Sequence, residues 1–246
     1  MVRAHFDAQG EVLLATGGAH GITRAAALAF ANAGGRSIIL DLAEPDQEVL
    51  NHPNIDVHLV DISQEDAVTA IVAKIIEQYG RIDALIAGAA IQPRHDVLEQ
   101  SAQSWQRVLE VNLNGVVWIS RAVAPQMIQQ RSGSMVFFTS GLALNGYAQA
   151  SAYAASKAAL IGYGKSLAAE LFEHRIKVNL ISPGVIDTPQ FRAANPGADW
   201  EHWRKTTGIG QPEDVVGPLL FLLSDAATMS GSILSRDKAL QEEAAE

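Results

Sequence analysis

Short runs of consecutive apolar residues alternate along this chain with longer stretches in which apolar residues recur every three or four positions. Runs such as Met135-Val136-Phe137-Phe138 have no polar face, as expected for strands covered on both sides. The longer stretches are typical of amphipathic helices. This alternation predicts an α/β fold, in which βαβ units build a doubly wound parallel sheet of about seven strands with helices on both faces.

The predicted strands are Val12–Ala15, Ser37–Leu40, Val57–Val60, Ala84–Ala87, Ser134–Thr139, Val178–Ile181 and Ser232–Leu234. The predicted helices are Ile22–Ala33, Gln64–Tyr79, Ser104–Gln130, Ser151–Glu173 and Pro212–Leu223. Two stretches, 141–150 and 188–210, fit no regular element, and a connection as long as 188–210 is typical of a lid over a site. We expect residues 1–246 to form one domain, with a charged tail at 235–246 that is either a frayed helix or disordered.

Composition excludes several classes of function. Apolar residues make up 48 % and charged residues 18 % of the 246 positions, which argues against disorder. There is no cysteine, and the seven histidines lack metal-ligand spacing, so we expect no metal. The net charge of −9 argues against a nucleic-acid partner. Because the amino terminus has no signal-type run and no apolar run approaches the ~20 residues that span a bilayer, we expect a cytoplasmic protein without membrane contact.

A glycine-rich turn follows the first predicted strand: Thr16-Gly17-Gly18-Ala19-His20-Gly21-Ile22-Thr23, with a helix directly after it. Glycines let backbone N–H groups approach a phosphate, and the helix N-terminus adds partial positive charge. A glycine turn that merely closes a βα unit would look the same in isolation. Together with the acid described next, the turn favours a Rossmann-type dinucleotide site.

Asp41 ends the second predicted strand, twenty residues after Gly21. An acid there accepts hydrogen bonds from ribose hydroxyls and repels a 2′-phosphate. Leu42 follows Asp41, so there is no adjacent basic side chain to bind that phosphate, and we expect NAD in preference to NADP. Asp61, after the third strand, either contacts the adenine edge or is simply an acid at a helix N-terminus.

Tyr153 and Lys157 are four residues apart and therefore project from one helix face. A nearby ammonium favours the phenolate, so Lys157 is expected to lower the tyrosine pKa from its usual value of about 10. A tyrosine tuned in this way can exchange a proton with an alcohol or ketone. Ser140 could polarise the substrate oxygen, although alone it would be read as a loop cap, and Asn112 alone as a helix-surface amide.

These motifs together resemble the short-chain dehydrogenase/reductase family of the single-domain classical type, over most of the chain. The matching pieces are Thr16-Gly17 with Gly21-Ile22, Asp41, Asp61-Ile62, Asn112, Ser140, Tyr153 with Lys157, and Ser182-Pro183-Gly184-Val185-Ile186-Asp187-Thr188.

The resemblance implies a role for each matching residue. Tyr153 would be the general acid/base, and Ser140 would hold the substrate oxygen. Lys157 would bind the nicotinamide ribose, and Asn112 would anchor a water that relays protons to it. The implied cofactor contacts are Thr16, Gly17, His20, Gly21, Ile22, Asp41, Asp61, Ile62, Ala87, Gly88, Ala89, Tyr153, Lys157, Pro183, Gly184, Val185 and Thr188.

The chain departs from the family pattern in three places. Thr23 replaces the third glycine of the loop, and Ala87-Gly88-Ala89-Ala90 replaces the usual Asn-Asn-Ala-Gly. Both changes put cofactor affinity in question. The usual acidic-glycine ending of the last strand is replaced by Ser235-Arg236-Asp237-Lys238. In the family this segment often forms part of the subunit interface, so the change concerns the geometry of the expected homo-oligomer (tetramer or dimer).

The substrate pocket is expected between segments 91–97, 141–150 and 188–210. Apolar walls and polar contacts are assigned to Gln92, Leu142, Tyr147, Phe191 and Trp203, while basic residues such as Arg94 and Arg192 could recognise anions or simply be solvated charges. The predicted function is NAD-dependent oxidation of a secondary alcohol or reduction of a ketone. The alternatives are a 3-oxoacyl thioester reductase, an epimerase or dehydratase on the same scaffold, and a nucleotide sensor without turnover.

Overall fold

The computed structural model describes residues 4–238. Within them a single seven-stranded sheet has the order β3-β2-β1-β4-β5-β6-β7, and every neighbouring pair is parallel. The strands are β1 (Val12–Thr16), β2 (Arg36–Asp41), β3 (Ile55–Leu59), β4 (Ala84–Ala87), β5 (Gly133–Phe138), β6 (Ile176–Ser182) and β7 (Ile233–Ser235). The predicted fold class is confirmed, and each predicted strand is present with bounds shifted by no more than two residues.

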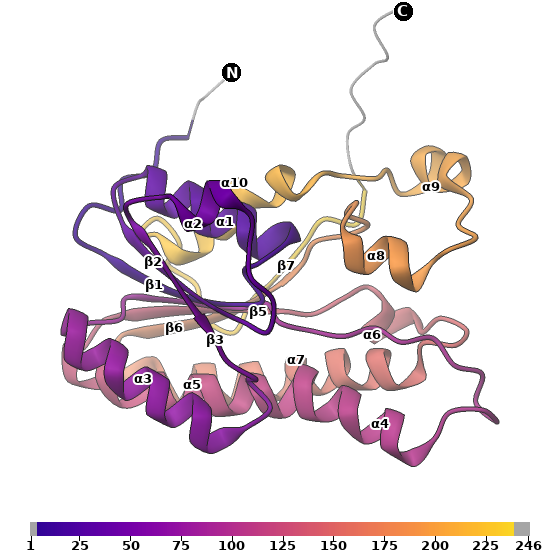
Figure 1. The fold of residues 1–246 in the computed structure, drawn as a ribbon, viewed down its shortest axis with the longest axis horizontal. Coiled ribbons are helices and arrows are strands. Elements are labelled where there is room, and N and C mark those ends of the chain that lie inside the picture. Colours follow the sequence, from indigo (N-terminus) through magenta and orange to yellow (C-terminus); the bar gives the residue numbers. More distant parts are fainter. Residues whose placement is uncertain (1–3, 239–246) are drawn as a thin grey trace, which may run out of the picture.

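Helices cover both faces of the sheet (Figure 1). The long helices α3, α5 and α7 lie below it in this view, and α1, α2 and α10 lie above it. The helices are α1 (Gly21–Asn32), α2 (Gln47–Leu50), α3 (Glu65–Tyr79), α4 (Ala102–Leu109), α5 (Gly115–Gln130), α6 (Leu142–Asn145), α7 (Ser151–Leu171), α8 (Pro189–Ala194), α9 (Trp200–Thr206) and α10 (Val216–Leu223). Among residues 4–238, no helix is both long and apolar enough to cross a bilayer.

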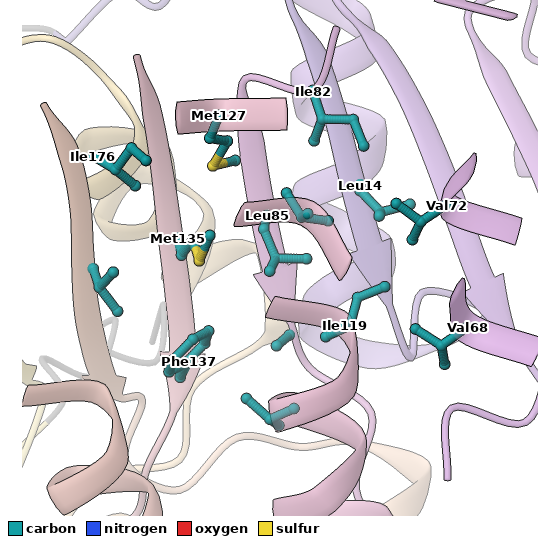
Figure 2. Close-up of a cluster of buried hydrophobic side chains, with 14 of the residues drawn as sticks. Leu14, Val68, Val72, Ile82, Leu85, Ile119, Met127, Met135, Phe137 and Ile176 are labelled. Atoms are coloured by element: carbon teal, nitrogen blue, oxygen red, sulfur yellow. The ribbon is translucent and has the colours of Figure 1, made fainter. Parts of the chain in front are cut away.

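Alternate residues of each strand point to opposite helical layers. Leu14 of β1 joins the cluster under α3 and α5, where Figure 2 shows Val72 and Ile119 packed against the strands. Its neighbour Leu13 joins the cluster on the other face, together with Leu219 of α10. The central strands β1, β4 and β5 are thus buried on both faces, which explains their apolar runs.

The predicted helix Ser104–Gln130 is wrong in its bounds and its continuity. It begins at Ala102, because the Ser101 hydroxyl accepts a hydrogen bond from the backbone N–H of Ser104 (3.1 Å). It then passes through a π-helical turn, η1 (Glu110–Asn114), before continuing as α5. Turns of this kind insert one extra residue into a helix and are frequent at functional sites.

Other element boundaries also differ from the prediction. The helix predicted to reach Glu173 ends its α-helical part at Leu171 and closes with a 3-10 turn, η2 (Phe172–His174). The helix predicted from Pro212 starts with a 3-10 turn, η3 (Pro212–Val215), in which the Asp214 carboxylate accepts from the Gln211 N–H.

The two stretches predicted as irregular contain short helices: α6 lies in 141–150, and α8 and α9 lie in 188–210. In Figure 1, α8 and α9 lie above α6 at the right-hand end of the sheet. Thr188 and Asp199 cap α8 and α9 with their side-chain oxygens. Of the predicted tail, Ser235 ends β7, and residues 239–246 lie outside the described chain.

The order of strands reverses direction between β1 and β4, where one half of the sheet is built outward from β1 and the other from β4. The connections leaving the carboxyl ends of these two strands diverge to opposite faces and leave a crevice between them. Ligands of open α/β sheets bind at this position. The fold therefore points to the segments after β1, β4, β5 and β6 as the site.

Candidate active site

The glycine loop after β1 forms a cradle of backbone N–H groups. Gly17 and Gly21 have φ angles of +74° and +62°, which side-chain-bearing residues rarely adopt. A Cβ on Gly17 would lie 2.6 Å from the Ala89 backbone, and one on Gly21 would lie 3.1 Å from the Thr188 side chain. His20 at the N-cap of α1 makes no side-chain capping bond. The N-terminus of α1 thus lines the cavity without a side-chain cap, and the loop fits the pyrophosphate of a dinucleotide.

Two departures from the family pattern, Thr23 and Gly88, lie next to each other beside this loop. Thr23 is buried, and its Oγ1 lies where a Cβ on Gly88 would come within 2.1 Å. The threonine side chain therefore fills the volume that a larger residue at position 88 would need. The loss of the third glycine and the loss of the asparagine form a complementary pair.

The Asp41 carboxylate braces the glycine loop as well as facing the crevice. One oxygen accepts from the backbone N–H of Ala19 (2.8 Å), and the other accepts from the N–H groups of Leu42 (2.7 Å) and Ala43 (3.1 Å). These bonds fix the carboxylate at the carboxyl end of β2. Asp41 thus lines the cavity with its negative charge held in place.

Asp61 lies after β3 in the cavity wall and is held there by its neighbours. One oxygen accepts from the N–H (2.9 Å) and hydroxyl (2.7 Å) of Ser63, and the other accepts from Arg107 (3.0 Å). Although burial opposes it, bonding to Ser63 and Arg107 lowers the pKa of Asp61. Asp61 precedes Gln64, the N-cap of α3, and also lines the cavity. Its contact with an adenine edge stays a prediction.

Tyr153 and Lys157 lie one turn apart near the start of α7, beside the end of β5. Lys157 is buried, and its Nζ donates to the carbonyl of Phe138 (2.9 Å) while lying 5.6 Å from the centre of the Tyr153 ring. Ser140 lies two residues beyond β5, and its Oγ accepts from the N–H of Leu142 (3.2 Å). The sheet and α7 thus bring the serine, tyrosine and lysine to one place.

The expectation that Lys157 lowers the pKa of Tyr153 is wrong for this geometry. Burial raises the pKa of Tyr153 to about 12, and the neighbouring Ser140 hydroxyl and the Arg94 charge act in the opposite direction. Burial also lowers the pKa of Lys157 to about 8. Both shifts have one cause, since a low-dielectric surrounding disfavours each charged form. Sequence spacing placed the two groups together but carried no information about their solvation.

Asn112 sits in the π-helical turn η1 (Glu110–Asn114) and is fully buried. Its amide clamps the segment after β4: it accepts from the N–H of Ile91 (2.8 Å), donates to the Ile91 carbonyl (2.9 Å) and donates to Ser156 (3.2 Å). The reading of Asn112 as a helix-surface amide is therefore wrong. Its side chain fixes the wall of the crevice against α7, and its part in a water relay stays a prediction.

An aromatic cluster holds the two lid helices together. The ring of Phe191 lies 5.6 Å from that of Trp200 and 4.9 Å from that of Trp203, measured between ring centres. Arg192 forms a bidentate pair with Asp187, with distances of 2.6 and 2.7 Å. Phe191 reaches the cavity, whereas Trp203 packs behind it.

One cavity of about 500 Å³ runs from the glycine loop to the lid. The predicted site residues in its wall are Gly17, His20, Gly21, Ile22, Asp41, Asp61, Ile62, Gly88, Ala89, Gln92, Tyr153, Lys157, Pro183, Gly184, Thr188 and Phe191. The predicted site residues outside its wall are Thr16, Ala87, Asn112, Ser140, Leu142, Tyr147, Val185 and Trp203. Among residues 4–238, no cluster of three or more metal-type ligands is present.

Those eight residues have other surroundings. The Thr16 hydroxyl accepts from the Ala89 N–H (3.3 Å), and the Val185 carbonyl accepts from the Gly210 N–H (2.9 Å). Tyr147 is exposed and lies under the Arg94 guanidinium. Thr16 and Val185 therefore support the wall rather than form it.

Sequence reasoning missed several residues of the cavity wall. Arg107, Val111 and Ile186 all line the cavity. Arg107 enters because its guanidinium donates to Ser63 and Asp61, which follow β3, and a single arginine on a helix gives no signal of that pairing. Ile186 was visible as part of the Pro183–Thr188 segment, and Val111 as the neighbour of Asn112.

Comparison with known proteins agrees with this geometry. Residues 11–199 match the family model described as short chain dehydrogenase. The chain is 33 % identical over 241 residues to 3-oxoacyl-(acyl-carrier-protein) reductase of Thermotoga maritima, covering 94 % of this chain and 98 % of that protein. It is 31 % identical to 2-dehydro-3-deoxy-D-gluconate 5-dehydrogenase of Dickeya dadantii, with 92 % and 93 % covered.

Solved structures show the same likeness. Levodione reductase superposes with a TM-score of 0.87 at 28 % identity, over 94 % of this chain and 97 % of that one. A protein of Beutenbergia cavernae assigned as an NAD(P)-dependent gluconate 5-dehydrogenase, which contains NADP at low occupancy, gives 0.85 at 30 % identity over 94 % and 96 %. With the family model matching most of the chain, this protein belongs to the short-chain dehydrogenase family of oxidoreductases.

Proposed function

We propose that this protein interconverts a secondary alcohol and a ketone with a nicotinamide dinucleotide as hydride carrier. The observation that carries the proposal is a single cavity lined by the glycine loop at one end and by Tyr153 and Lys157 at the other. When bound, the nicotinamide ring supplies or accepts the hydride. The protein must then hold the reacting carbon in place and manage one proton.

Tyr153 is the general acid/base in this proposal. Its high pKa keeps the phenol protonated at neutral pH, which suits donation of a proton to a ketone oxygen during reduction. The Ser140 hydroxyl and the Arg94 charge both favour the phenolate and so ease the loss of that proton. Ser140 also offers a hydrogen bond to the developing alkoxide. Lys157, held by the Phe138 carbonyl, is placed to donate to ribose hydroxyls and to pass a proton on.

We further infer a preference for NAD over NADP. The fixed carboxylate of Asp41 would repel a 2′-phosphate, and the nearest arginine of α1, Arg24, is already paired with Asp46 (2.7 Å) and Glu48 (2.6 Å). This reading stands against the NADP found in the matched Beutenbergia cavernae structure. A direct comparison of NADH and NADPH as reductants decides it.

The second candidate is reduction of a 3-oxoacyl thioester, because 3-oxoacyl-(acyl-carrier-protein) reductase of Thermotoga maritima is 33 % identical over nearly the whole chain. The net charge of −9 weighs against an acidic carrier protein as partner. Homo-oligomeric assembly and a cytoplasmic location stay predictions, which light scattering and cell fractionation would test.

The experiment that tests the proposed function is NADH consumption by Tyr153→Phe against a panel of ketones. Losing the proton donor should lower kcat by roughly 10²- to 10⁴-fold and leave NADH binding, followed by fluorescence, nearly unchanged. Tyr163→Phe is the matched control, because Tyr163 lies on the same helix but bonds to Ser120 (2.6 Å) away from the cavity. Turnover by Tyr153→Phe at the rate of Tyr163→Phe would refute the assignment, and NADH binding by a wild type that turns over no ketone would favour the sensor.

A further inference from the structure

Arg236 directly follows strand β7, in the segment that replaces the usual acidic-glycine ending. Its N–H donates to the Ser182 carbonyl (2.9 Å), which continues the β6–β7 pairing by one residue. Its own carbonyl lies close against Gly184, since a Cβ on that glycine would come within 2.3 Å of the oxygen. Gly184 lines the cavity, so the chain after β7 supports the cavity wall from behind.

The lid, residues 188–210, is closed at its base beside the same wall. The N–H of Gly210 donates to the Val185 carbonyl (2.9 Å), and the Gly210 carbonyl accepts from the N–H of Asp187 (2.9 Å). These bonds form a short parallel bridge between Ile186 and Gly210. Ile186 and helix α8 both line the cavity, so the position of this bridge determines how the lid covers it.

The Arg236 guanidinium lies directly over Gly210. A Cβ on this glycine would come within 2.6 to 2.9 Å of three guanidinium atoms, although its φ angle is not in the left-handed region. The Arg236 side chain is 21 % exposed, and one terminal nitrogen donates to the Asp214 carboxylate (3.3 Å). The same oxygen accepts from the N–H of Gln211 (2.8 Å), the residue after the lid. Arg236 thus joins the end of β7, the base of the lid and the start of η3.

Other contacts hold the lid at α8 and leave its base to Arg236. The Gln190 side chain donates to the Ala90 carbonyl (3.0 Å), and the Arg94 side chain donates to the Ala194 carbonyl (3.3 Å). Both join α8 to the segment after β4. A lid held only at α8 could still shift about its base, so the contacts of Arg236 remove a freedom that these bonds leave.

We propose that Arg236 is a positioning residue that locks the base of the lid and thereby slows the release of NADH. Its backbone supports the wall at Gly184, and its guanidinium fixes Gly210 to η3 through Asp214. A bound dinucleotide leaves only when the lid moves away from the cavity, and lid opening limits turnover in many enzymes. The effect on NADH rests on the proposed function, whereas the lock itself does not.

The test of the lock is cleavage of the native protein by trypsin after the exposed lid residues Arg192, Arg204 and Lys205, with the fragments identified by mass spectrometry. Cleavage there requires local opening, so its rate follows the open population of the lid. Arg236→Met should raise this rate by roughly 5- to 10-fold, the size expected for loss of one partly exposed hydrogen bond between charged groups. Arg236→Lys should restore part of the protection.

Two internal references separate the lock from general stability. Cleavage after the exposed residues Lys74 of α3 and Lys165 of α7 should be the same in Arg236→Met and wild type. Arg121→Met is the matched control, because it removes an exposed arginine that pairs with Glu65 (2.6 Å) between α5 and α3, and it should leave lid cleavage unchanged.

Gly210→Ala tests the same contact from the other side, because its methyl group would displace the guanidinium without removing it. It should speed lid cleavage in the wild type but add little in the Arg236→Met background, where the shorter side chain leaves room for the methyl group. NADH release, followed by stopped-flow displacement, should accelerate in Arg236→Met by a factor similar to that for lid cleavage.

Lid cleavage of Arg236→Met at the rate of Arg121→Met overturns the proposal. An equal rise after Lys74 and Lys165 does so too, since it would show only a loss of global stability. Effects of Gly210→Ala and Arg236→Met that multiply in the double variant also overturn it, as does NADH release at the wild-type rate despite faster lid cleavage. A wild type that binds no NADH contradicts the proposed function instead, and the cleavage rates then still decide whether Arg236 locks the lid.

Discussion

The contact between Thr23 and Gly88 makes a sharp prediction about stability. A methyl group at position 88 would place its Cβ 2.1 Å from the Thr23 Oγ1, far inside van der Waals contact, with the Thr16 carbonyl at 3.1 Å as a tighter-than-usual neighbour. Because Thr23 is β-branched and set in helix α1, it has few rotamers into which it can retreat. Gly88→Ala should therefore lower the free energy of unfolding by about 1 to 3 kcal/mol, the usual cost of overpacking.

The double-mutant cycle isolates that contact. Thr23→Ala removes the hydroxyl that collides with the new methyl, so Gly88→Ala should cost less in the Thr23→Ala background, with a coupling energy of at least about 1 kcal/mol. Urea unfolding of the four proteins, followed by circular dichroism, measures all terms. Equal cost of Gly88→Ala in both backgrounds, or no cost in the wild type, would refute the view that the two departures compensate one another.

Three further predictions concern the site. Asp41→Arg should raise the ratio of kcat/KM for NADPH to that for NADH by roughly 10-fold or more, because the carboxylate no longer repels the 2′-phosphate. Asp41→Asn is the uncharged control, and a wild type that already prefers NADPH would contradict this prediction. The folded protein releases the Lys157 proton above about pH 8, whereas the unfolded chain keeps it up to about pH 10.5. Between pH 8 and 10 the free energy of unfolding of the wild type should therefore rise by about 2 kcal/mol relative to that of Lys157→Met, as measured by urea unfolding. Unfolding free energies of the two proteins that change in parallel with pH would disprove this. Asn112→Ala should lower the free energy of unfolding by about 2 to 4 kcal/mol, because it leaves the buried N–H and carbonyl of Ile91 without hydrogen-bond partners. A loss below about 0.5 kcal/mol, which is typical of surface substitutions, would count against the role of Asn112 as a clamp.

The architecture was predictable because burial on both faces of a parallel sheet leaves a direct trace in sequence. Runs such as that around Phe137 mark the strands, and the turn from Gly17 to Gly21 marks the crossover at the crevice. The spacing of Tyr153 and Lys157 survives because a regular helix fixes it. These features depend on residues close together in the chain.

What could not be predicted depends on contacts between distant segments. Arg107 meets Asp61 across two elements, and Arg94 meets the end of α8 a hundred residues later. The pKa values of Tyr153 and Lys157 follow from solvation, which no spacing encodes. The π-helical turn at Asn112 contains neither glycine nor proline, so no helix-breaking residue marks it in the sequence.

Apart from the proposed catalytic residues Ser140 and Tyr153, the residues assigned to the substrate pocket lie in segments outside the sheet, while the sheet itself is covered on both faces by apolar packing. Segments 91–97, 141–150 and 188–210 can therefore be exchanged between relatives without rebuilding the interior. Such a division lets substitutions that alter substrate choice accumulate at little cost to folding, so that divergence among these enzymes would be concentrated in three peripheral segments of the chain.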